Sequence, residues 1–497
     1  MNGHGKSDRL VVPGKSPNKA GPSAAEGMEG RSLAKGNTEQ QNTPRTQSRN
    51  ERVLSALDRV RELARQNREV RFTALLHHVT LDRLRDSFLA LRRNAAPGVD
   101  GETWDHYAEG MEERLRDLHG RVHRGAYRAK PSRRVLIPKT DGKERALGIA
   151  ALEDKIVQRA VAEVLNAIYE EDFVGFSYGF RPGRSPHHAL DAFAVGIRRK
   201  KVNWVLDADI RGFFDSIDHG WLLRFLEHRI ADPRLLRLTQ KWLCAGVLEN
   251  GKRTKTERGT PQGATISPLL ANVYLHYVFD LWADSWRNRW AQGDVVIVRF
   301  ADDVVIGFQH RSDAKKFEEA LRDRLAKFQL ELHEGKTRLV EFGRFADRDR
   351  RARGLGKPET FDFLGFTHIC GKTRGGDFLL HRKTMRTRMR AKLREVKTEL
   401  RRRRHLPVPE QGKWLGSVVR GHYAYYAVPT NASAVAAFSY WVVRLWHRSL
   451  SRRSQKARIP WPRMARYRTR WIPSARILHL WPEQRFRVRT QGRSPVR

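Results

Sequence analysis

The sequence has little cysteine and no long apolar run. Only two cysteines, Cys244 and Cys370, occur in 497 residues, too few for a disulfide framework or a zinc cluster, which fits a reducing compartment. No apolar run reaches the roughly 18 residues that a membrane-spanning helix needs. The N-terminus also lacks the apolar segment of a secretory signal. We therefore expect a cytoplasmic protein without a membrane partner.

Acidic residues are also scarce relative to basic ones. The chain has 55 Asp and Glu against 96 Lys and Arg, a formal net charge of +41. Such a charge favours a polyanionic partner, most simply nucleic acid, bound in a salt-dependent way. A membrane surface is the competing interpretation. Hydrophobic residues make up 40% of the chain, which is enough for sizeable folded cores at this length.

Composition divides the chain into four parts. Residues 1–50 are rich in Gly, Ser, Asn, Pro and Gln and lack periodic apolar residues, so we predict a disordered basic extension. Residues 51–385 combine helical patterns, short strands and Gly-rich loops. Residues 386–475 begin with a strongly basic helix and continue as helices, and residues 476–497 form a short basic tail. The stretch from Ser451 is rich in Arg, Trp and Pro, and we expect it to cross the surface.

The periodicity of apolar residues predicts the main elements. The predicted helices are Leu81–Leu91, Asp154–Tyr169, Trp221–Leu248, Ser312–Leu330, Met385–Arg404, Trp414–Tyr426 and Ala434–Leu450. The predicted strands are Arg133–Ile137, Asn203–Ile210, Val295–Phe300, Val304–Phe308 and Phe361–Ile369.

Two acidic clusters interrupt apolar strands in this basic chain. Asp302 and Asp303 lie within Val298–Phe308, where we predict that they form the tight turn of a hairpin. Alone, such a pair would be a solvated turn, because Asp is common in turns. Upstream, Asp207 and Asp209 alternate with apolar residues and share one face of a strand. A carboxylate in an apolar strand is costly unless it is paired or binds a metal.

A divalent metal site explains both clusters together. If the two strand regions lie side by side, Asp209, Asp302 and Asp303 converge, and three carboxylates can hold two Mg²⁺ ions. In polymerases one such ion activates a 3′-hydroxyl and the other stabilises the leaving pyrophosphate. Either cluster alone is weak evidence, whereas their combination in a basic chain is much stronger.

Several motifs resemble those of group II intron-encoded reverse transcriptases with maturase activity. Arg299-Phe-Ala-Asp-Asp303 resembles the catalytic box of the family, and Asp209–His219 resembles its first metal-binding motif. Further segments are similar to family blocks and follow the family's order: Asn94–Gly101, Ile137–Ile149, Ser177–Arg184, Gly259–Leu270, Phe361–Phe366, Gly421–Tyr426 and Leu445–Arg448. Ordered motifs over about residues 75 to 475 are far more specific than any single motif.

The resemblance implies an α+β right-hand polymerase. Fingers and an antiparallel palm sheet would occupy residues 51–385, and an α-helical thumb, or maturase domain, residues 386–475. The implied activity is RNA-directed DNA synthesis with two Mg²⁺ ions and deoxynucleoside triphosphates on an RNA template–primer. The protein would bind its own intron RNA, assist splicing and copy the intron into a DNA target during retrohoming, as a ribonucleoprotein at the bacterial nucleoid.

Two alternatives remain open. The protein could be a splicing-only maturase whose polymerase has decayed, although Asp209, Asp302 and Asp303 are all present. It could also be a reverse transcriptase of another retroelement lineage, such as a retron or a diversity-generating element. The maturase-like segment Gly421–Arg448 argues against that lineage.

The resemblance also implies roles for single residues. The catalytic metal ligands would be Asp209, Asp302 and Asp303 with the carbonyl of Ile210, while Asp207 would be structural. The residues expected around the incoming nucleotide are Lys139 and Arg145 for the triphosphate, Phe213 against a ribose 2′-hydroxyl, Gln262 for the nucleotide, Gly263 for close approach of the template–primer and Lys336 for pyrophosphate. The residues expected to contact nucleic acid are Arg181, Arg184, Lys392, Arg394, Tyr423 and Arg448.

Some of these roles have plain alternatives. Phe214 is the second choice for the sugar contact, and both phenylalanines could instead lie in the core. Gly263 could be an ordinary turn glycine, and Lys336 a surface lysine. Aromatic residues of the C-terminal helices, such as Tyr423, stack on unpaired bases in RNA-binding proteins, but at helical spacing they fit a packed core better.

The chain departs from the family pattern in two respects. Phe300 stands where the catalytic box usually begins with Tyr, so the ring is kept and only the hydroxyl is lost. We expect activity to survive, with altered fidelity or nucleotide affinity. Many family members continue into a zinc-stabilised HNH-type endonuclease with cysteine pairs. No cysteine follows Cys370, so we predict no endonuclease domain and a basic tail as a candidate DNA contact.

Overall fold

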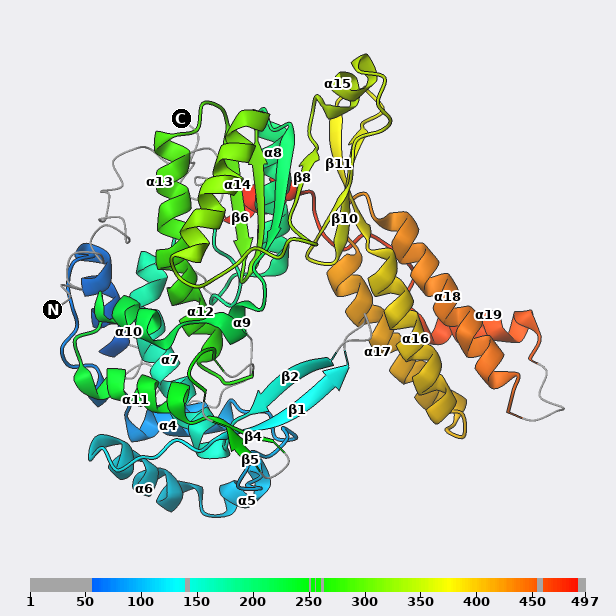
Figure 1. Ribbon diagram of the computed structural model, residues 1–497. Helices are drawn as coiled ribbons and strands as arrows, with labels where there is room; N and C mark the ends of the chain where they lie inside the picture. Colours follow the sequence, from blue (N-terminus) through cyan, green and yellow to red (C-terminus); the bar gives the residue numbers. More distant parts are fainter. Residues whose placement is uncertain are drawn as a thin grey trace.

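The computed structural model describes residues 56–138, 144–249, 252–254, 256–260, 263–453 and 459–489 (Figure 1). The predicted disordered extension, residues 1–50, lies outside these ranges. Helices and antiparallel strands alternate along the chain, which confirms the predicted α+β class. Among the described helices, none combines the length and apolar character needed to cross a bilayer.

The central sheet has four antiparallel strands in the order β6-β7-β3-β8. Its strands are β3 (Trp204–Asp209), β6 (Val295–Phe300), β7 (Asp303–Phe308) and β8 (Arg338–Glu341). The strands are rich in β-branched residues, which favour the pleated conformation. The predicted strands Asn203–Ile210, Val295–Phe300 and Val304–Phe308 are therefore confirmed to within one residue at each end.

Most of the helices precede the last strand of this sheet. They are a helix over 56–66, the 3₁₀-helix η1 (Leu76–His78), α4 (Leu81–Leu89), α5 (Trp104–Glu109), α6 (Met111–His123), α7 (Leu152–Asp172), α8 (Pro186–Arg199), α9 (Phe213–Ser216), α10 (His219–Glu227), α11 (Pro233–Cys244), α12 (Ser267–Leu275), the π-helix η2 (His276–Asp280), α13 (Leu281–Arg289) and α14 (Arg311–Ala326). A second sheet, in the order β2-β1-β4-β5, joins β1 (Ser132–Pro138), β2 (Glu144–Ile149), β4 (Val247–Glu249) and β5 (Lys252–Thr254).

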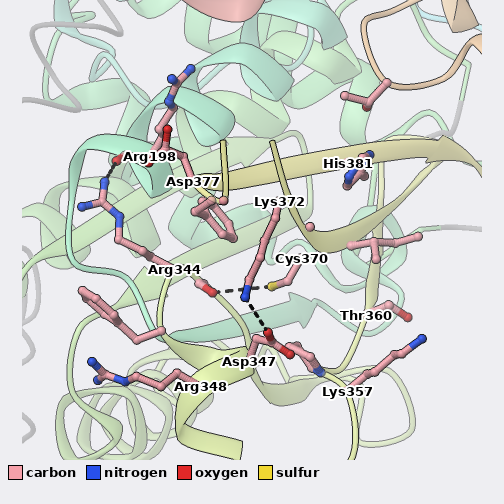
Figure 2. Close-up of a pocket in the computed structure, with 18 of the residues that line it drawn as sticks. Arg198, Arg344, Asp347, Arg348, Lys357, Thr360, Cys370, Lys372, Asp377 and His381 are labelled. Atoms are coloured by element: carbon pink, nitrogen blue, oxygen red, sulfur yellow. Dashed lines mark hydrogen bonds and ion pairs between the residues drawn. The ribbon is translucent and has the colours of Figure 1, made fainter. Parts of the chain in front are cut away.

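A third sheet, in the order β11-β10-β9, follows the central one. After α15 (Ala346–Ala352), its strands are β9 (Phe361–Phe363), β10 (Phe366–Lys372) and β11 (Phe378–Thr384). Residues on α8, α15, β10 and β11 line a groove, seen in Figure 2. A single strand over Phe361–Ile369 was a wrong prediction, because Leu364 and Gly365 both have positive φ angles, of 47° and 80°, and break it into β9 and β10.

The C-terminal helices form a separate core. They are α16 (Arg386–Arg402), α17 (Val408–Tyr426), α18 (Ala432–Leu450) and α19 (Trp461–Trp471), whereas α20 (Pro482–Arg489) packs against α8. Figure 1 shows α16, α17 and α18 side by side, extending away from the central sheet. Trp446 is fully buried among them and donates a hydrogen bond from Nε1 to Oε1 of Gln411 at 3.1 Å. Burial of such a large ring contributes strongly to this core.

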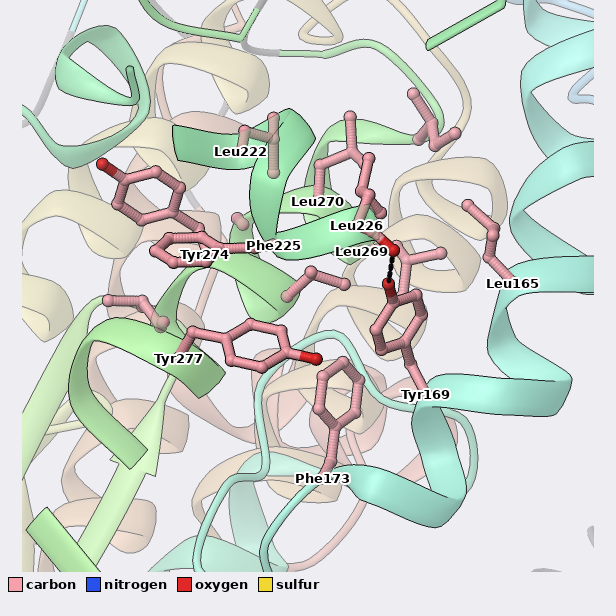
Figure 3. Packing of buried hydrophobic residues seen from close by; sticks show 14 of the residues in the cluster. Leu165, Tyr169, Phe173, Leu222, Phe225, Leu226, Leu269, Leu270, Tyr274 and Tyr277 are labelled. Atoms are coloured by element: carbon pink, nitrogen blue, oxygen red, sulfur yellow. Dashed lines mark hydrogen bonds between the residues drawn. The ribbon is translucent and has the colours of Figure 1, made fainter. Parts of the chain in front are cut away.

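The largest core lies where α7, α10, α12 and η2 meet (Figure 3). The aromatic rings of Tyr169, Phe225 and Tyr274 pack there with leucines of the same helices, and the Tyr169 hydroxyl donates to the Leu226 carbonyl at 3.3 Å. The predicted helix Asp154–Tyr169 is thus α7, extended at both ends. The predicted helical stretch Trp221–Leu248 is divided into α10 and α11, because Asp232 caps a new helix whose first residue is Pro233, and the last two residues of the stretch lie in β4.

The C-terminal tail returns to the central part of the chain. Arg485 on α20 lies 2.6 Å from Asp191 on α8, and Arg382 on β11 binds the same buried carboxylate at 2.9 Å. A second pair joins Glu483 to Arg198 at 2.7 Å. The sequence did not predict helices in this tail, and two ion pairs attach α20 to α8.

The Arg485→Ala substitution is expected to lower the free energy of unfolding by about 2 kcal/mol, because a charged hydrogen bond to a buried carboxylate is lost. Asp191 keeps Arg382, so the effect stays moderate. Limited trypsin digestion should then cleave the tail faster. The matched control is Arg476→Ala in the same tail, whose exposed side chain makes no described ion pair. Equal protease sensitivity of the two variants would contradict the attachment.

Candidate active site

The two acidic clusters lie side by side at one end of the central sheet. β3 and β7 pair so that Asp209 is directly opposite Asp303, and Phe300 of β6 pairs with Asp303 from the other side. Directly opposed residues in antiparallel strands have Cβ atoms about 5 Å apart on the same face. The structure thus brings Asp209 and Asp303 together, as the sequence predicts if the strands are neighbours.

The hairpin turn differs from the prediction by one residue. Its two turn residues are Ala301 and Asp302, and Asp303 is the first residue of β7. Ala301 has a φ of +58°, as the first residue of a type II′ turn does, and this turn matches the twist of the flanking strands. The shift matters because it places Asp303 within the ladder beside Asp209 and Asp302 at the tip.

The buried side chain of Arg299 supports this turn. Arg299 and Asp280 are both fully buried and form a bidentate pair with two distances of 2.6 Å. Arg299 also donates to Asn272 Oδ1 at 3.1 Å, to Ser177 Oγ at 2.6 Å and to the Ala301 carbonyl at 2.9 Å. The turn is therefore tied to α12, η2 and the loop before α8. Sequence reasoning missed this role, although an arginine inside an apolar strand was a usable signal.

The loop before α8 packs against the same turn. A Cβ added to Gly179 would lie 2.2 Å from the backbone nitrogen of Ala301, so only glycine fits there. The Asn272 side chain donates to the Gly179 carbonyl at 2.7 Å. The Gly-rich character of Ser177–Arg184 therefore serves the close approach of this loop to the turn.

Arg181 stabilises this loop from inside. Its side chain is buried, lies 3.0 Å from Glu170 and donates to the carbonyls of Val174 and Ser177. Burial is also the main cause that lowers the pKa of Arg181 to about 10. Its predicted contact with nucleic acid was wrong, because the guanidinium is already enclosed by protein.

Burial, followed by neighbouring carboxylates, raises the pKa of two aspartates at this site. The Asp303 carboxylate is open to solvent on one side but otherwise surrounded by protein, and this desolvation, followed by repulsion from Asp302 and Asp209, raises its pKa to about 6. Desolvation likewise raises the pKa of Asp207 to about 7, opposed by Arg338 at 3.8 Å. The Lys336 ammonium lies 2.7 Å from Asp209 Oδ2, and this hydrogen bond raises the pKa of Lys336.

The chemistry of these groups fits divalent cations. Within the described residues, no three His, Cys, Asp or Glu side chains are already arranged to hold a metal ion. At this site Lys336 occupies one oxygen of Asp209 and supplies a positive charge there. Mutual repulsion of Asp209, Asp302 and Asp303 is what a bound cation relieves, and hard carboxylate oxygens suit Mg²⁺.

The backbone beside Asp209 also presents an oxygen. The His333 amide donates to the Asp209 carbonyl at 2.7 Å, and the Arg211 amide donates to the Glu331 carbonyl at 2.9 Å. In this pattern the carbonyl of Ile210, between the two bonded residues, points away from the 331–337 segment. Asp303 is the first residue of β7, so no strand of the sheet pairs with Ile210 on that side.

Comparison with known proteins agrees with this geometry. Residues 137–368, which contain the sheet, the turn and all three carboxylates, match the family described as "Reverse transcriptase (RNA-dependent DNA polymerase)". The chain contains a reverse transcriptase domain. Its central sheet is the antiparallel palm, and the resemblance to reverse transcriptases is confirmed for this domain.

The relatives of this domain include intron-encoded proteins. Protein YkfC of Escherichia coli is 35% identical over 240 residues, which are 42% of this chain and 62% of YkfC. The group II intron-encoded protein LtrA of Lactococcus lactis is 37% identical over 229 residues, 45% of this chain and 37% of LtrA. Nuclear intron maturase 2 of Arabidopsis thaliana is 30% identical over 112 residues, 21% of this chain and 15% of that protein. The matched parts therefore cover less than two thirds of each relative.

Of the two phenylalanines in the first motif, the palm buries Phe213. Its side chain is 2% exposed and packs against Tyr274, whereas Phe214 is partly exposed beside the exposed ring of Phe180. Gly212, with a φ of 54°, is the N-cap of the short helix α9. This helix sets the directions in which the two rings point. The prediction of Phe213 as the sugar contact was wrong, because its ring is enclosed by the core.

The Phe214→Val substitution is expected to weaken discrimination against ribonucleotides by roughly 10- to 100-fold, because the partly exposed ring of Phe214 is the one expected to contact the sugar. Phe213→Leu is the matched control, expected to cost under about 1.5 kcal/mol of stability without changing sugar selectivity. Primer extension with deoxynucleotides and ribonucleotides in competition measures both. Relaxed selectivity in Phe213→Leu alone would contradict the assignment.

The other predicted nucleotide contacts are only partly described. Lys139 and Gln262 lie outside the described residues, and only the backbone of Arg145 is described, in β2 opposite Ile137. Gly263 has a φ of +113°, and a Cβ there would lie 2.7 Å from the Gly148 carbonyl. Packing on β2 thus explains this glycine. Lys336 is brought to the carboxylates, as described above.

The residues predicted to contact nucleic acid on the C-terminal helices differ in how deeply their side chains are buried. Tyr423 is 2% exposed and belongs to the core of the C-terminal helices, so its predicted RNA contact was wrong. Arg394 and Arg448 are exposed, and Lys392 lies 2.7 Å from Glu395. In the palm loop, the partly exposed Arg184 donates to the Gly175 carbonyl at 2.6 Å.

Proposed function

We propose that this protein is an RNA-directed DNA polymerase and a group II intron maturase. The observation that carries the proposal is the pairing of Asp209 with Asp303, with Asp302 in the adjoining turn, inside a reverse transcriptase domain. We assign fingers and palm to residues 51–385, thumb and maturase domain to 386–475, and a tail to 476–497. The thumb begins with α16. Desolvation and the neighbouring carboxylates raise the pKa of Asp303, and the charge of Arg388 on α16 is close enough to offset part of this rise.

The chain's own groups would act as follows. Asp209, Asp302 and Asp303, with the Ile210 carbonyl, would hold two Mg²⁺ ions, and the ions would supply charge stabilisation for the attacking 3′-oxygen and the leaving pyrophosphate. Lys336, now paired with Asp209, places its charge beside the pyrophosphate. The remaining contacts to the incoming nucleotide are Lys139 and Arg145 on the triphosphate, Gln262 on the nucleotide and Phe214 against the sugar.

RNA binding is supported by the exposed face of α16. Only Val396 and Leu400 of this helix are buried, and the other positions include many arginines and lysines. The exposed basic residues are Arg386, Arg388, Arg390, Arg394, Lys397, Arg401 and Arg402. Such a face suits the phosphates of intron RNA and of a template–primer. The protein would act as a ribonucleoprotein at the nucleoid and copy its intron into a DNA target.

Primer extension tests the polymerase. Purified protein with an RNA template annealed to a DNA primer, deoxynucleoside triphosphates and Mg²⁺ should yield complementary DNA, and chelation of Mg²⁺ with EDTA should stop synthesis. A splicing assay with the flanking intron RNA tests the maturase role. Splicing without synthesis would favour the splicing-only alternative, and synthesis without splicing would favour another retroelement lineage. If the protein showed neither synthesis nor splicing assistance, the proposal as a whole would be contradicted.

A further inference from the structure

A basic groove lies away from the carboxylates. It has a volume of about 1390 Å³ and is bounded by the end of α8, the α15 region, β10, β11 and the start of α18 (Figure 2). Seven arginines and lysines line it, against two acids, Asp347 and Asp377. Typical small-ligand pockets measure about 300–1,000 Å³. The groove is therefore larger than a single small anion would need, and its charge favours a polyanion.

The groove is at the opposite end of the palm sheet from the active site. Gly343 and Arg344 line the groove just after β8, whose last residue, Glu341, pairs with Trp204 at the start of β3. Asp209 is the last residue of β3, five residues further on. At about 3.3 Å per residue the two ends are roughly 17 Å apart. Changes at the Arg344 end of the groove can therefore be made without touching the carboxylates.

Acidic side chains attach the α15 region to the sheets. Glu341 of β8 binds Arg350 at 3.4 Å and also pairs with Arg353. Asp347 binds Lys372 of β10 at 3.2 Å, and the Cys370 thiol donates to the Gly343 carbonyl at 3.7 Å (Figure 2). Of the two acids that line the groove, Asp347 is thus paired within the protein.

Three basic residues of the groove remain available. Arg344, Lys357 and Lys383 are exposed, and in the part of the chain that the structure describes none of them has an ion pair. Arg344 donates only to the Arg198 carbonyl. Like cations on a fixed surface repel one another unless an anion lies between them. The hydroxyls of Thr360 and Ser433 also line the groove and can bond a ribose 2′-hydroxyl, which DNA lacks.

We propose that this groove binds the phosphodiester backbone of RNA outside the polymerase cleft, with Arg344, Lys357 and Lys383 as its main phosphate contacts. This inference deepens the proposed function, on which it rests for the presence of a bound RNA. In this proposal, the RNA segment that is bound for docking lies in the groove, and the RNA segment that is copied as template lies in the polymerase cleft. The groove then anchors a structured RNA while the palm copies a different segment.

The test is equilibrium binding of a labelled, structured RNA hairpin to the full chain, with the polymerase cleft kept filled by an unlabelled RNA template–DNA primer duplex. The variant carries Arg344→Ala, Lys357→Ala and Lys383→Ala together. Each phosphate contact contributes about fourfold to affinity at about 0.15 M salt, so the variant should bind about 50-fold more weakly. The slope of log affinity against log salt should fall by about 2.

A charge-matched control removes three exposed basic residues elsewhere: Arg116→Ala, Lys315→Ala and Lys316→Ala. Its affinity for the hairpin should stay within about threefold of the wild-type value. A DNA hairpin of the same sequence should bind the wild type more weakly than the RNA does, because it lacks the 2′-hydroxyls that Thr360 and Ser433 can bond. Equal loss in the control, no loss in the groove variant, or equal wild-type affinity for RNA and DNA would each overturn the inference.

Primer extension on a short template keeps this inference distinct from the proposed function. The groove variant should extend the primer at the wild-type rate, because none of its three side chains has a described contact with Asp209, Asp302 or Asp303. If the wild type extends primers but the groove variant binds the hairpin normally, only the groove inference fails. If the wild type extends nothing while the groove variant still loses binding, the polymerase proposal fails and the groove remains.

Discussion

Replacing Asp302 and Asp303 together with alanine is expected to reduce primer extension on an RNA template by about 10³- to 10⁴-fold. Bound Mg²⁺ supplies several kcal/mol of charge stabilisation in the transition state, and each 1.4 kcal/mol is a factor of ten in rate. Asp303 lies opposite Asp209 in the ladder, so removing it opens the metal site from the β7 side. The rate of nucleotide incorporation measures the effect.

Asp207→Asn is the matched control. Asp207 shares the strand face of Asp209 but lies two residues before it and pairs with Arg338 at 3.8 Å, so its loss should change extension by less than about tenfold. RNA binding and splicing assistance should survive the double substitution, because neither needs the metal ligands. Loss of splicing together with synthesis would contradict that separation.

The double variant should also be at least as stable as the wild type. Desolvation and repulsion from its neighbours raise the pKa of Asp303, so its charged form is less favourable in the folded chain than in the unfolded chain. Removing two of three adjacent negative charges relieves this repulsion. A melting temperature that falls sharply would indicate a folding role instead and would undermine the activity result.

The parts predictable from sequence were those set by local pattern. Alternation of apolar residues around Asp207 and Asp209 located β3, and the runs flanking Asp302 located the hairpin. The sequence predicted that Asp209 and Asp303 would converge on the condition that these strands are neighbours, and the structure pairs them. The one-residue error in the turn arose because two-residue hairpin turns are chosen by strand twist, which two adjacent aspartates do not reveal.

Other features depended on contacts distant in sequence. Which of Phe213 and Phe214 faces the core is set by the direction of α9 after Gly212, not by residue type. Among 96 Lys and Arg, charge alone could not distinguish the buried Arg181 from exposed arginines. The ion pair between Arg485 and Asp191 joins residues that are 294 apart, and nothing near either residue indicated it.

Arg299→Met is expected to lower the free energy of unfolding by about 3–5 kcal/mol. It leaves Asp280 fully buried without its partner, and breaking a buried ion pair from one side has costs of this size. Arg299→Lys should recover little, because an ammonium cannot form the bidentate contact or reach Asn272, Ser177 and the Ala301 carbonyl together. Urea denaturation followed by fluorescence measures the loss.

A surface pair provides the control for this substitution. Arg322 lies 2.8 Å from Glu318 on the exposed side of α14, and Arg322→Ala should change stability by less than about 1 kcal/mol. If Arg299→Met were no more destabilising than this variant, the buried network would not be what supports the turn.

The double substitution Arg299→Met with Asp280→Leu separates folding from positioning. Replacing both members of a buried ion pair with apolar residues of similar size is often neutral for stability, so much of the lost stability should return. The bond from Arg299 to the Ala301 carbonyl does not return. Primer extension should therefore stay at least about tenfold below the wild type, since the turn that carries Asp302 is no longer fixed against α12 and η2. Full recovery of both stability and extension would show that the arginine serves the fold alone and has no part in placing the carboxylates.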